Sequence, residues 1–227
     1  MIVAAIIPAA GAGRRMGAPK QWLNIAGRPL LCWTLAAFER CPEVDYVVLV
    51  VPEADIELAR RRVVEPCGLA KVRAVAAGGA ERQDSVWNGL QALSAPPPDI
   101  VMVHDGARPL IEPEVLTRAV RATIECGATL CAVPVRDTIK RVGPAGEVMK
   151  TLPREGLWQA QTPQTFRYDV LATAFEEARR ENFVATDEAA LVERLGHQVR
   201  VVMGARRNFK VTTPEDIELA ERLLKED

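Results

Sequence analysis

The chain alternates between two kinds of segment along nearly its whole length. Short apolar runs rich in β-branched residues alternate with longer stretches in which apolar residues recur at helical spacing. The runs lie at 2–7, 45–51, 71–76, 99–103, 129–135 and 198–203, and the stretches lie at about 30–40, 53–65, 81–94, 113–127, 168–181, 186–195 and 214–226. Because residues 46–51 are apolar throughout, both faces of the sheet should be covered. The pattern predicts an α/β fold, a doubly wound and mostly parallel sheet with helices on both faces.

Composition sets the size and the setting of this fold. The 227 residues, 48% of them hydrophobic, suffice for one sizeable core, so we expect a single domain over 1–227. A net charge of −1 argues against a general binder of nucleic acid or of membrane surfaces. No apolar stretch approaches the roughly 20 residues of a membrane span. The strand-like start at Ile2 leaves no room for a targeting peptide, so we expect a cytoplasmic protein that binds neither nucleic acid nor membrane.

The cysteines and histidines give no sign of a metal centre. Five cysteines occur without a C-x-x-C pair, and there are two histidines, so the ligand spacing of a zinc site is missing. We therefore expect the cysteines to be small buried hydrophobic residues.

A glycine-rich loop follows the first apolar run and carries three cations. Gly11 and Gly13 permit positive φ and close approach of the backbone, so N–H groups of this loop can surround phosphate oxygens. Arg14, Arg15 and Lys20 would add positive charge around the same polyphosphate. The glycines are spaced one residue too widely for the GxGxxG dinucleotide motif, and no GxxxxGK[ST] P-loop fits the segment. The loop predicts a phosphate site of another kind.

Ligands of doubly wound sheets collect outside the carboxyl ends of the strands. The segments that follow predicted strands are therefore the best candidates for a site, and they are 8–20, 77–85, 104–109 and 204–212. Asp105 follows the run 99–103 directly, which makes it a natural Mg²⁺ ligand beside substrate phosphates. Alternatively, Asp105 caps its turn or pairs with Arg108. We expect the neighbouring His104 to be structural.

Three other segments each have two readings. Gly79 and Ser85 join a strand to a helix and could face a ligand, or the segment could be a plain helix start whose acidic residues complement the dipole. Thr186 precedes a helix and could bind substrate or serve only as part of an N-terminal cap. Lys210 lies in a strand-like stretch and could reach the site or be a surface lysine.

One segment interrupts the β-α rhythm. Residues 137–142 and 147–152 alternate polar and apolar side chains around a Gly-Pro-Ala-Gly turn, which predicts a β-hairpin. An isolated hairpin is marginal in water, so we expect an arm at about 136–157 that packs on a second subunit. The alternative is an antiparallel edge hairpin of the main sheet.

Cations, one candidate metal carboxylate and no evident nucleophile favour phosphoryl or nucleotidyl transfer. These reactions depend chiefly on positioning and charge stabilisation. If the acceptor is a phosphate monoester, its second pKa is near 6, so its oxygen is already an anion at pH 7 and needs no catalytic base.

Six segments together resemble one enzyme family. The segments PAAGAGRRM, HDGARP, PVRDTIK, GLWQAQTPQ, TDE and NFKVT, in this order, are similar to those of 2-C-methyl-D-erythritol 4-phosphate cytidylyltransferases of the non-mevalonate isoprenoid pathway. The first segment alone marks only the wider nucleotidyltransferase superfamily. The resemblance spans nearly the whole chain and implies a Rossmann-like nucleotidyltransferase domain. It also implies that the substrate phosphate attacks the α-phosphorus of CTP, with Mg²⁺ present and pyrophosphate released.

The resemblance also implies roles for individual residues. Arg15 and Lys20 would stabilise the pentavalent transition state and the departing pyrophosphate, and Asp105 would bind Mg²⁺. The nucleotide would be contacted by Ala9, Ala10, Gly11, Gly79 and Ser85. The polyol phosphate would be held by Arg108, Thr138, Arg154, Thr162, Thr186 and Lys210, with Arg154 and Lys210 aiming its oxygen. The arm would clasp the second subunit of a homodimer, so that Thr138 and Arg154 serve the neighbour's site.

Several rival functions stay open at this point. A cytidylyltransferase for another polyol phosphate, such as ribitol 5-phosphate, would have a closely similar sequence. The first loop alone also fits a sugar-1-phosphate nucleotidyltransferase that uses UTP or GTP. A non-catalytic nucleotide-sensing module belongs to a different class, because spacing cannot establish turnover. A dehydrogenase is the least favoured.

Overall fold

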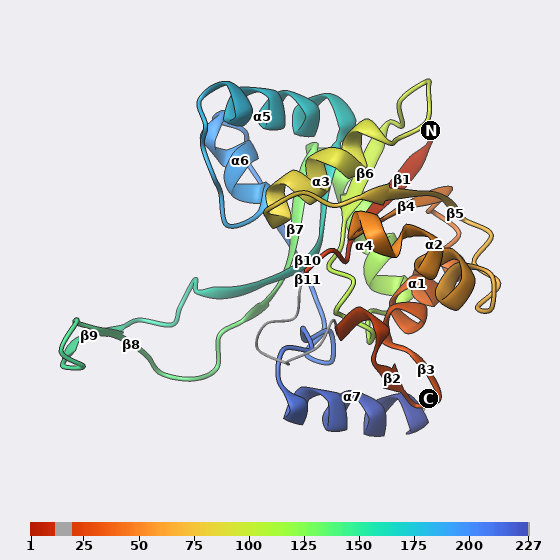
Figure 1. Ribbon diagram of the computed structural model, residues 1–227. Helices are drawn as coiled ribbons and strands as arrows, with labels where there is room; N and C mark the ends of the chain where they lie inside the picture. The colour runs from red at the N-terminus through yellow and green to blue at the C-terminus, as the bar shows by residue number, and fades with distance from the viewer. Residues whose placement is uncertain (12–19, 227) are drawn as a thin grey trace.

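The computed structural model describes residues 1–11 and 20–226, and within them a seven-stranded sheet forms the centre of the molecule (Figure 1). The strand order is β11-β7-β10-β6-β1-β4-β5. All neighbouring pairs are parallel except those of β10, which runs antiparallel to both β6 and β7. The strands are β1 (Val3–Pro8), β4 (Tyr46–Val51), β5 (Val72–Ala77), β6 (Ile100–Val103), β7 (Ala128–Pro134), β10 (Trp158–Arg167) and β11 (Arg200–Met203). The predicted fold class is confirmed.

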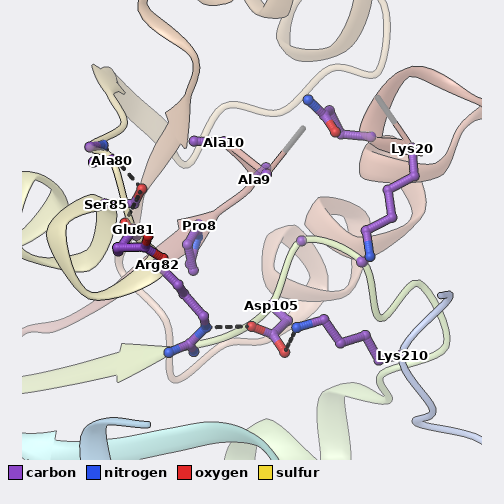
Figure 2. A pocket seen from close by; sticks show the side chains of 15 residues that line it. Pro8, Ala9, Ala10, Lys20, Ala80, Glu81, Arg82, Ser85, Asp105 and Lys210 are labelled. Atoms are coloured by element: carbon purple, nitrogen blue, oxygen red, sulfur yellow. Dashed lines mark hydrogen bonds and ion pairs between the residues drawn. The ribbon is translucent and has the colours of Figure 1, made fainter. Parts of the chain in front are cut away.

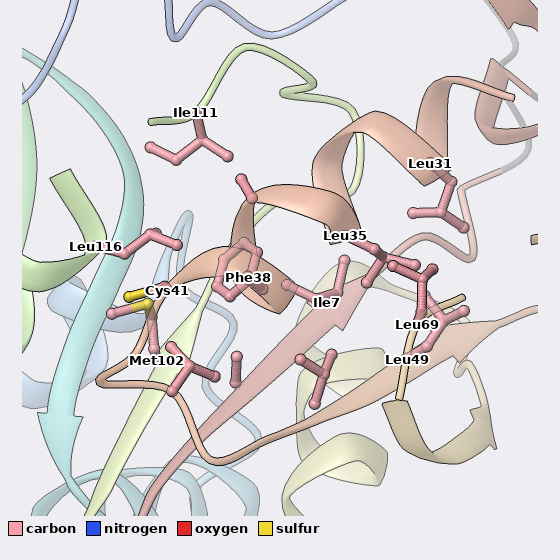
Figure 3. Close-up of a cluster of buried hydrophobic side chains, with 14 of the residues drawn as sticks. Ile7, Leu31, Leu35, Phe38, Cys41, Leu49, Leu69, Met102, Ile111 and Leu116 are labelled. Carbon is pink, nitrogen blue, oxygen red and sulfur yellow. The ribbon is translucent and has the colours of Figure 1, made fainter. Parts of the chain in front are cut away.

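Helices cover both faces of this sheet, and each face has its own core. One face is covered by α1 (Leu30–Arg40), α2 (Ile56–Ala59), the π-helical turn η4 (Arg60–Val64) and α4 (Pro113–Cys126), and the other by α3 (Arg82–Gln91), α5 (Tyr168–Arg180) and α6 (Glu188–Arg194). Side chains of β1 alternate between the two cores: Ile7 packs with Phe38 on the first face (Figure 3), and Ile6 packs in the second. This alternation explains why the strand is apolar at every position.

A smaller cluster closes the carboxyl edge of the sheet. The last helix, α7 (Pro214–Glu226), packs with the short hairpin β2 (Asn24–Ile25) and β3 (Arg28–Pro29) through buried Ile25, Leu30 and Ala220. This hairpin was not predicted. The amphipathic stretch at 53–65 is not one helix but a 3₁₀ turn, η3 (Glu53–Asp55), followed by α2 and η4. A second 3₁₀ turn, η2 (Lys20–Trp22), places Trp22 against the core of the first face.

Strand β10 was not predicted either, although it lies in the middle of the sheet. Its sequence is polar and contains Pro163, which normally argues against a central strand. The ladder with β7 is irregular between Ala160 and Gln164, so the proline lies where pairing is interrupted. Two of its buried polar side chains are hydrogen-bonded to distant segments: Gln161 donates to the carbonyl of Ala205, and Gln164 accepts from the amide of Ala189. Tertiary hydrogen bonds therefore replace the missing apolar pattern.

The predicted hairpin is present and stands apart from the sheet. Its strands, β8 (Ile139–Val142) and β9 (Val148–Leu152), form a separate two-stranded sheet that projects from the body as an arm (Figure 1). The alternative, an edge hairpin of the main sheet, is therefore wrong. The arm exposes Val142, Val148 and Met149, each by more than half of its surface. Trp158, at its base, is 41% exposed.

The expectation that every cysteine is a lone buried side chain is wrong for two of them. Cys32 of α1 and Cys67, which follows η4, form a disulfide across 35 residues. The pair ties α1 to the segment that packs beside it on the same face of the sheet. Cys41, Cys126 and Cys131 are free, and Cys41 and Cys131 are buried as expected.

We expect the disulfide to stabilise the oxidised protein measurably. Closing a loop of this length lowers the entropy of the unfolded chain, worth about 2–4 kcal/mol. Cys67→Ser should lower the free energy of unfolding by that amount, measured by urea denaturation without reductant. Cys126→Ser removes a free thiol and serves as the control. If the Cys67→Ser variant were as stable as the wild type, the disulfide would not form in solution.

Among the helices that the structure describes, none is long and apolar enough to cross a membrane.

Candidate active site

A cavity of about 400 Å³ opens at the edge of the sheet where the parallel strands end. It is lined by the loops after β1, β5 and β6, with one side chain from the segment after β11 and two from η2 (Figure 2). The lining residues are Pro8, Ala9, Ala10, Gly11, Lys20, Gln21, Gly79, Ala80, Glu81, Arg82, Ser85, Asp105, Gly106, Ala107 and Lys210. The four segments predicted to form a site thus all contribute to one cavity.

The loops after β1 and β5 meet closely on one side of the cavity. A Cβ atom added to Gly78 would lie 2.3 Å from the Cβ of Ala10, so only glycine fits there. A Cβ on Gly79 would lie 2.2 Å from the Cβ of Asp84. This close packing brings backbone groups of both loops to the cavity surface, as a nucleotide-binding role for Ala9 to Gly11 and Gly79 requires.

Ser85 lies in the first turn of α3, beside the cavity. Its Oγ donates to the carbonyl of Glu81 at 3.1 Å and accepts from the amide of Gly79 at 3.1 Å. One lone pair of the hydroxyl is left for a ligand. Glu81 and Asp84 form a capping box, so the helix start is also capped by its own acidic residues.

Asp105 lies at the base of the cavity among three cations. Its Oδ1 is 3.0 Å from Nε of Arg82, and its Oδ2 is 3.0 Å from Nζ of Lys210 and 3.5 Å from Nε of Arg108 (Figure 2). The side chain of Asp105 is 9% exposed. The predicted pairing with Arg108 is therefore present, but it is the weakest of the three contacts.

The charge state of Asp105 follows from a competition of two effects. Burial alone would raise the pKa of this carboxyl, but Arg82, Lys210 and Arg108 together hold the pKa well below its usual range. The group is thus a carboxylate at neutral pH. A buried anion surrounded by more positive than negative charge is suited to a site that binds phosphate and a divalent cation.

Arg82 is a site residue that sequence reasoning missed. Its Nη1 and Nη2 donate to Oε1 and Oε2 of Glu188 at 2.6 and 3.0 Å, while its Nε reaches Asp105. Glu188 is 1% exposed and comes from the start of α6. Burial raises the pKa of Glu188, and the guanidinium of Arg82 opposes that shift. A charged residue on the buried side of an amphipathic helix was the one available signal in the sequence.

A buried chain of hydrogen bonds lies beneath Asp105. The amide of Asp105 donates to Oγ1 of Thr162 at 3.1 Å, and this hydroxyl is also hydrogen-bonded to Nδ1 of His104 at 3.0 Å. His104 is fully buried, and desolvation, with Arg108 adding to it, lowers its pKa to about 3. The neutral imidazole is structural, as expected. Thr162 is 4% exposed and holds the backbone of Asp105, so its direct contact with substrate stays a prediction.

Lys20 approaches the cavity from the side opposite Ser85 (Figure 2). It begins η2, and its Nζ donates to the carbonyl of Val211 at 3.0 Å. This bond joins the first loop to the segment that carries Lys210. The two lysines therefore reach the same cavity from segments that are far apart in the sequence.

Comparisons with known proteins agree with this architecture. The family model for 2-C-methyl-D-erythritol 4-phosphate cytidylyltransferase matches residues 3–226. The chain belongs to this cytidylyltransferase family. The curated enzyme of that name from Geotalea uraniireducens is 56% identical over 229 residues, which cover 99% of this chain and 97% of the relative. The Geobacter metallireducens enzyme of the same name is 51% identical, and the match covers 100% of this chain and 99% of the relative.

Solved structures of cytidylyltransferase relatives share the fold over nearly the full chain. The Thermus thermophilus enzyme, with the family's name, superposes with a TM-score of 0.82 at 37% identity and covers 99% of this chain and 100% of its own. The Anaerococcus prevotii 4-diphosphocytidyl-2C-methyl-D-erythritol synthase superposes with a TM-score of 0.86 at 30% identity. The superposition covers 99% of this chain and 96% of the relative.

The remaining residues assigned through the cytidylyltransferase resemblance lie at different depths. Arg108 is 9% exposed and donates from Nη1 to the carbonyl of Asn208 at 2.8 Å, so it supports the floor of the site. Thr186 is exposed directly before Asp187, whose carboxylate caps α6 by accepting from the amide of Ala190. The capping role thus belongs to Asp187, and Thr186 stays a predicted substrate contact.

Two predicted substrate residues lie on the arm and not at the cavity of the same chain. Thr138 and Arg154 are exposed, and Arg154 donates from Nη1 to the carbonyl of Arg136 at 2.8 Å, across the base of the arm. Neither lines the described cavity. Their contribution to the site of a second subunit stays a prediction. Arg15 falls within 12–19, outside the described residues, so its role stays a prediction.

The residues present fit a Mg²⁺ ion that is held jointly with substrate. Across the described residues, no group of three or more His, Cys, Asp or Glu side chains could hold a metal ion alone. Nucleotide sites typically bind Mg²⁺ through one or two carboxylates plus phosphates and water. Asp105 supplies one ionised carboxylate at the cavity, and its Oδ2 faces a lysine that an ion could displace. The donor set is therefore adequate only once phosphates are bound.

Proposed function

We propose that this chain transfers the cytidylyl group of CTP to 2-C-methyl-D-erythritol 4-phosphate. A phosphate oxygen of the acceptor attacks the α-phosphorus of CTP. The bond from the α-phosphorus to the bridging oxygen breaks, and pyrophosphate leaves with the electron pair. The products are 4-CDP-2-C-methyl-D-erythritol and pyrophosphate, an early step of isoprenoid precursor synthesis.

One observation carries this proposal: a buried, ionised carboxylate, that of Asp105, lies beside Lys210 in a cavity that Lys20 also lines. Displacement at phosphorus needs positive charge around the entering, leaving and equatorial oxygens. The acceptor phosphate is already an anion at neutral pH, so the site does not need to remove a proton from it.

On the nucleotide side, backbone groups of Ala9, Ala10, Gly11 and Gly79 contact the cytidine. Ser85 uses its remaining lone pair to accept a hydrogen bond from the base. Backbone groups of these two loops would select cytosine over larger bases. Arg15 and Lys20 stabilise the charge that develops on the pentavalent phosphorus and the pyrophosphate.

On the acceptor side, Lys210 and the Arg154 of a second subunit aim the attacking oxygen. Thr138 of that subunit and Thr186 bind the polyol phosphate, and Arg108 and Thr162 support the pocket from below. Mg²⁺, held by Asp105 and the phosphates, would neutralise charge on the triphosphate. Lys210 must then leave Oδ2 of Asp105, which frees its ammonium for the acceptor phosphate.

The arm makes a homodimer the proposed working form. Its strands expose Val142, Val148 and Met149, and Lys140 and Arg141 directly precede Val142 in β8. A hairpin with so little core of its own becomes stable when a second copy covers it. We also place the reaction in the cytoplasm, where nucleoside triphosphates are found.

Release of pyrophosphate tests whether the chain is an enzyme and which nucleotide it uses. The assay supplies 2-C-methyl-D-erythritol 4-phosphate and Mg²⁺ with CTP, UTP or GTP in turn. We expect release with CTP and at least about 10-fold less with the others, because one pocket contact with a base discriminates by that order. Faster release with UTP or GTP would contradict the nucleotide assignment. No release with CTP and any polyol phosphate would favour a nucleotide-sensing module.

A further inference from the structure

The two oxygens of the Asp105 carboxylate have different kinds of partner. Oδ1 is bonded to the guanidinium of Arg82 at 3.0 Å, and Oδ2 is bonded to the ammonium of Lys210 at 3.0 Å. Figure 2 shows the carboxylate between these two side chains, which approach from opposite sides. The carboxylate is therefore oriented by two contacts that could be broken separately.

Arg82 is held far more firmly than Lys210. All three of its guanidinium nitrogens are used, because Nε binds Asp105 while Nη1 and Nη2 bind both oxygens of Glu188. A planar guanidinium that is hydrogen-bonded to two carboxylates has little freedom to move. Lys210 offers a single ammonium on a flexible stem, and its side chain is 35% exposed. A cation that competes for Asp105 will displace the lysine before the arginine.

Glu188 is the fixed end of this arrangement. It is 1% exposed and belongs to the first turn of α6, whose start is capped by Asp187. Removing one partner of a buried charge pair is costly, so Glu188 and Arg82 depend on each other. The pair joins the start of α3, the start of α6 and the loop after β6.

We propose that Arg82, anchored by Glu188, is a positioning residue that fixes the Asp105 carboxylate and reserves Oδ2 for exchange between Lys210 and a divalent cation. The inference rests on the proposed function. It explains how loading of the cation releases Lys210 toward the acceptor phosphate while the carboxylate keeps its orientation. Neither Arg82 nor Glu188 touches the reacting atoms in this account.

The test compares Mn²⁺ binding by the full-length protein in the presence of CTP without acceptor, measured by electron paramagnetic resonance. Arg82→Lys keeps the positive charge but loses the planar guanidinium that bonds Asp105 and Glu188 together. Glu188→Gln keeps the size of the side chain but loses the negative charge that holds Arg82. We expect both to weaken Mn²⁺ binding at least about 10-fold, because each variant loses a charged hydrogen bond on which the orientation of the Asp105 carboxylate depends. In turnover assays both should lower kcat and raise the Mg²⁺ requirement while leaving the KM for CTP within twofold.

Arg194→Lys is the matched control, because it makes the same change in an exposed Arg-Glu pair at the other end of α6. It should leave Mn²⁺ binding and kcat unchanged. The double variant Arg82→Lys/Glu188→Gln should bind Mn²⁺ no more weakly than whichever single variant has the lower affinity. Both substitutions break the same chain of contacts, so their effects should not add.

Three results would overturn the inference. A folded Arg82→Lys or Glu188→Gln variant that binds Mn²⁺ within twofold of the wild type would show that Asp105 needs no such support. Additive losses in the double variant would show that the two residues act separately. Failure of both single variants to fold would assign the pair to stability instead. If the wild-type chain bound Mn²⁺ with CTP but transferred no cytidylyl group, the proposed function would be wrong. The comparison of Mn²⁺ binding between the wild type and the variants would still test the role of Arg82 and Glu188.

Discussion

Lys20→Ala is expected to lower kcat at least about 100-fold, the scale of losing one preorganised group that stabilises transition-state charge. The side chain of Lys20 lines the cavity, and its ammonium donates a hydrogen bond to the carbonyl of Val211 at 3.0 Å. Loss of one hydrogen bond typically costs about 1 kcal/mol, so the effect on kcat should far exceed the effect on the free energy of unfolding. Steady-state kinetics and urea denaturation of the same preparation separate the two effects.

Lys225→Ala provides the control for the lysine prediction. Lys225 pairs with Glu221 on the exposed face of α7, so its removal should change neither kcat nor stability appreciably. If Lys20→Ala kept kcat within twofold of the wild type, the assignment of Lys20 to the transition state would be wrong.

Deleting residues 138–152 is expected to give a monomer with about 1% of the activity or less. The deletion removes β8, β9 and Thr138, and with them the exposed apolar side chains proposed to pack on the second subunit. It leaves both cores of the main sheet untouched, so the body should stay folded. Sedimentation velocity gives the oligomeric state, and pyrophosphate release gives the activity. A fully active monomer would contradict the shared site.

A mixing experiment tests the same point without a deletion. If each site uses its own Lys20 and the Arg154 of the second subunit, a dimer of one Lys20→Ala chain and one Arg154→Ala chain contains one intact site. Random assembly of the two inactive variants should then restore about a quarter of wild-type activity in a two-fold symmetric dimer. If Arg154 served its own chain, mixing would restore nothing.

The main sheet could be predicted from the sequence because most of its strands are buried on both faces. A strand such as Tyr46–Val51 has no position that faces water, so its sequence is a continuous run of apolar, mostly β-branched residues. Such a run is typical of a strand that is covered on both faces. The loops that follow such strands then identify the site, since parallel strands end at one edge. By contrast, β10 is held in the sheet by side-chain hydrogen bonds of Gln161 and Gln164 to distant segments. No local pattern records such partners.

The Arg82–Glu188 pair escaped prediction for the same reason. The two residues are 106 positions apart, and each lies in a segment with a sufficient local explanation. Arg82 follows a glycine turn at a helix start, and Glu188 is an acidic residue in the first turn of a helix, where acids are common. The position of Glu188 on the apolar side of its helix was a hint of burial, but only the fold shows that its partner is Arg82. The Cys32–Cys67 disulfide is similar, because the spacing of five cysteines without a motif does not select a pair.

The most direct test of the account is a comparison of acceptors. The rates kcat/KM are measured with CTP and Mg²⁺ for 2-C-methyl-D-erythritol 4-phosphate and for ribitol 5-phosphate, and the product is identified by mass spectrometry. The account predicts a preference of at least about 100-fold for methylerythritol phosphate, because a site built to bind one set of hydroxyl groups rejects a mismatched set strongly. A higher kcat/KM with ribitol 5-phosphate would contradict it.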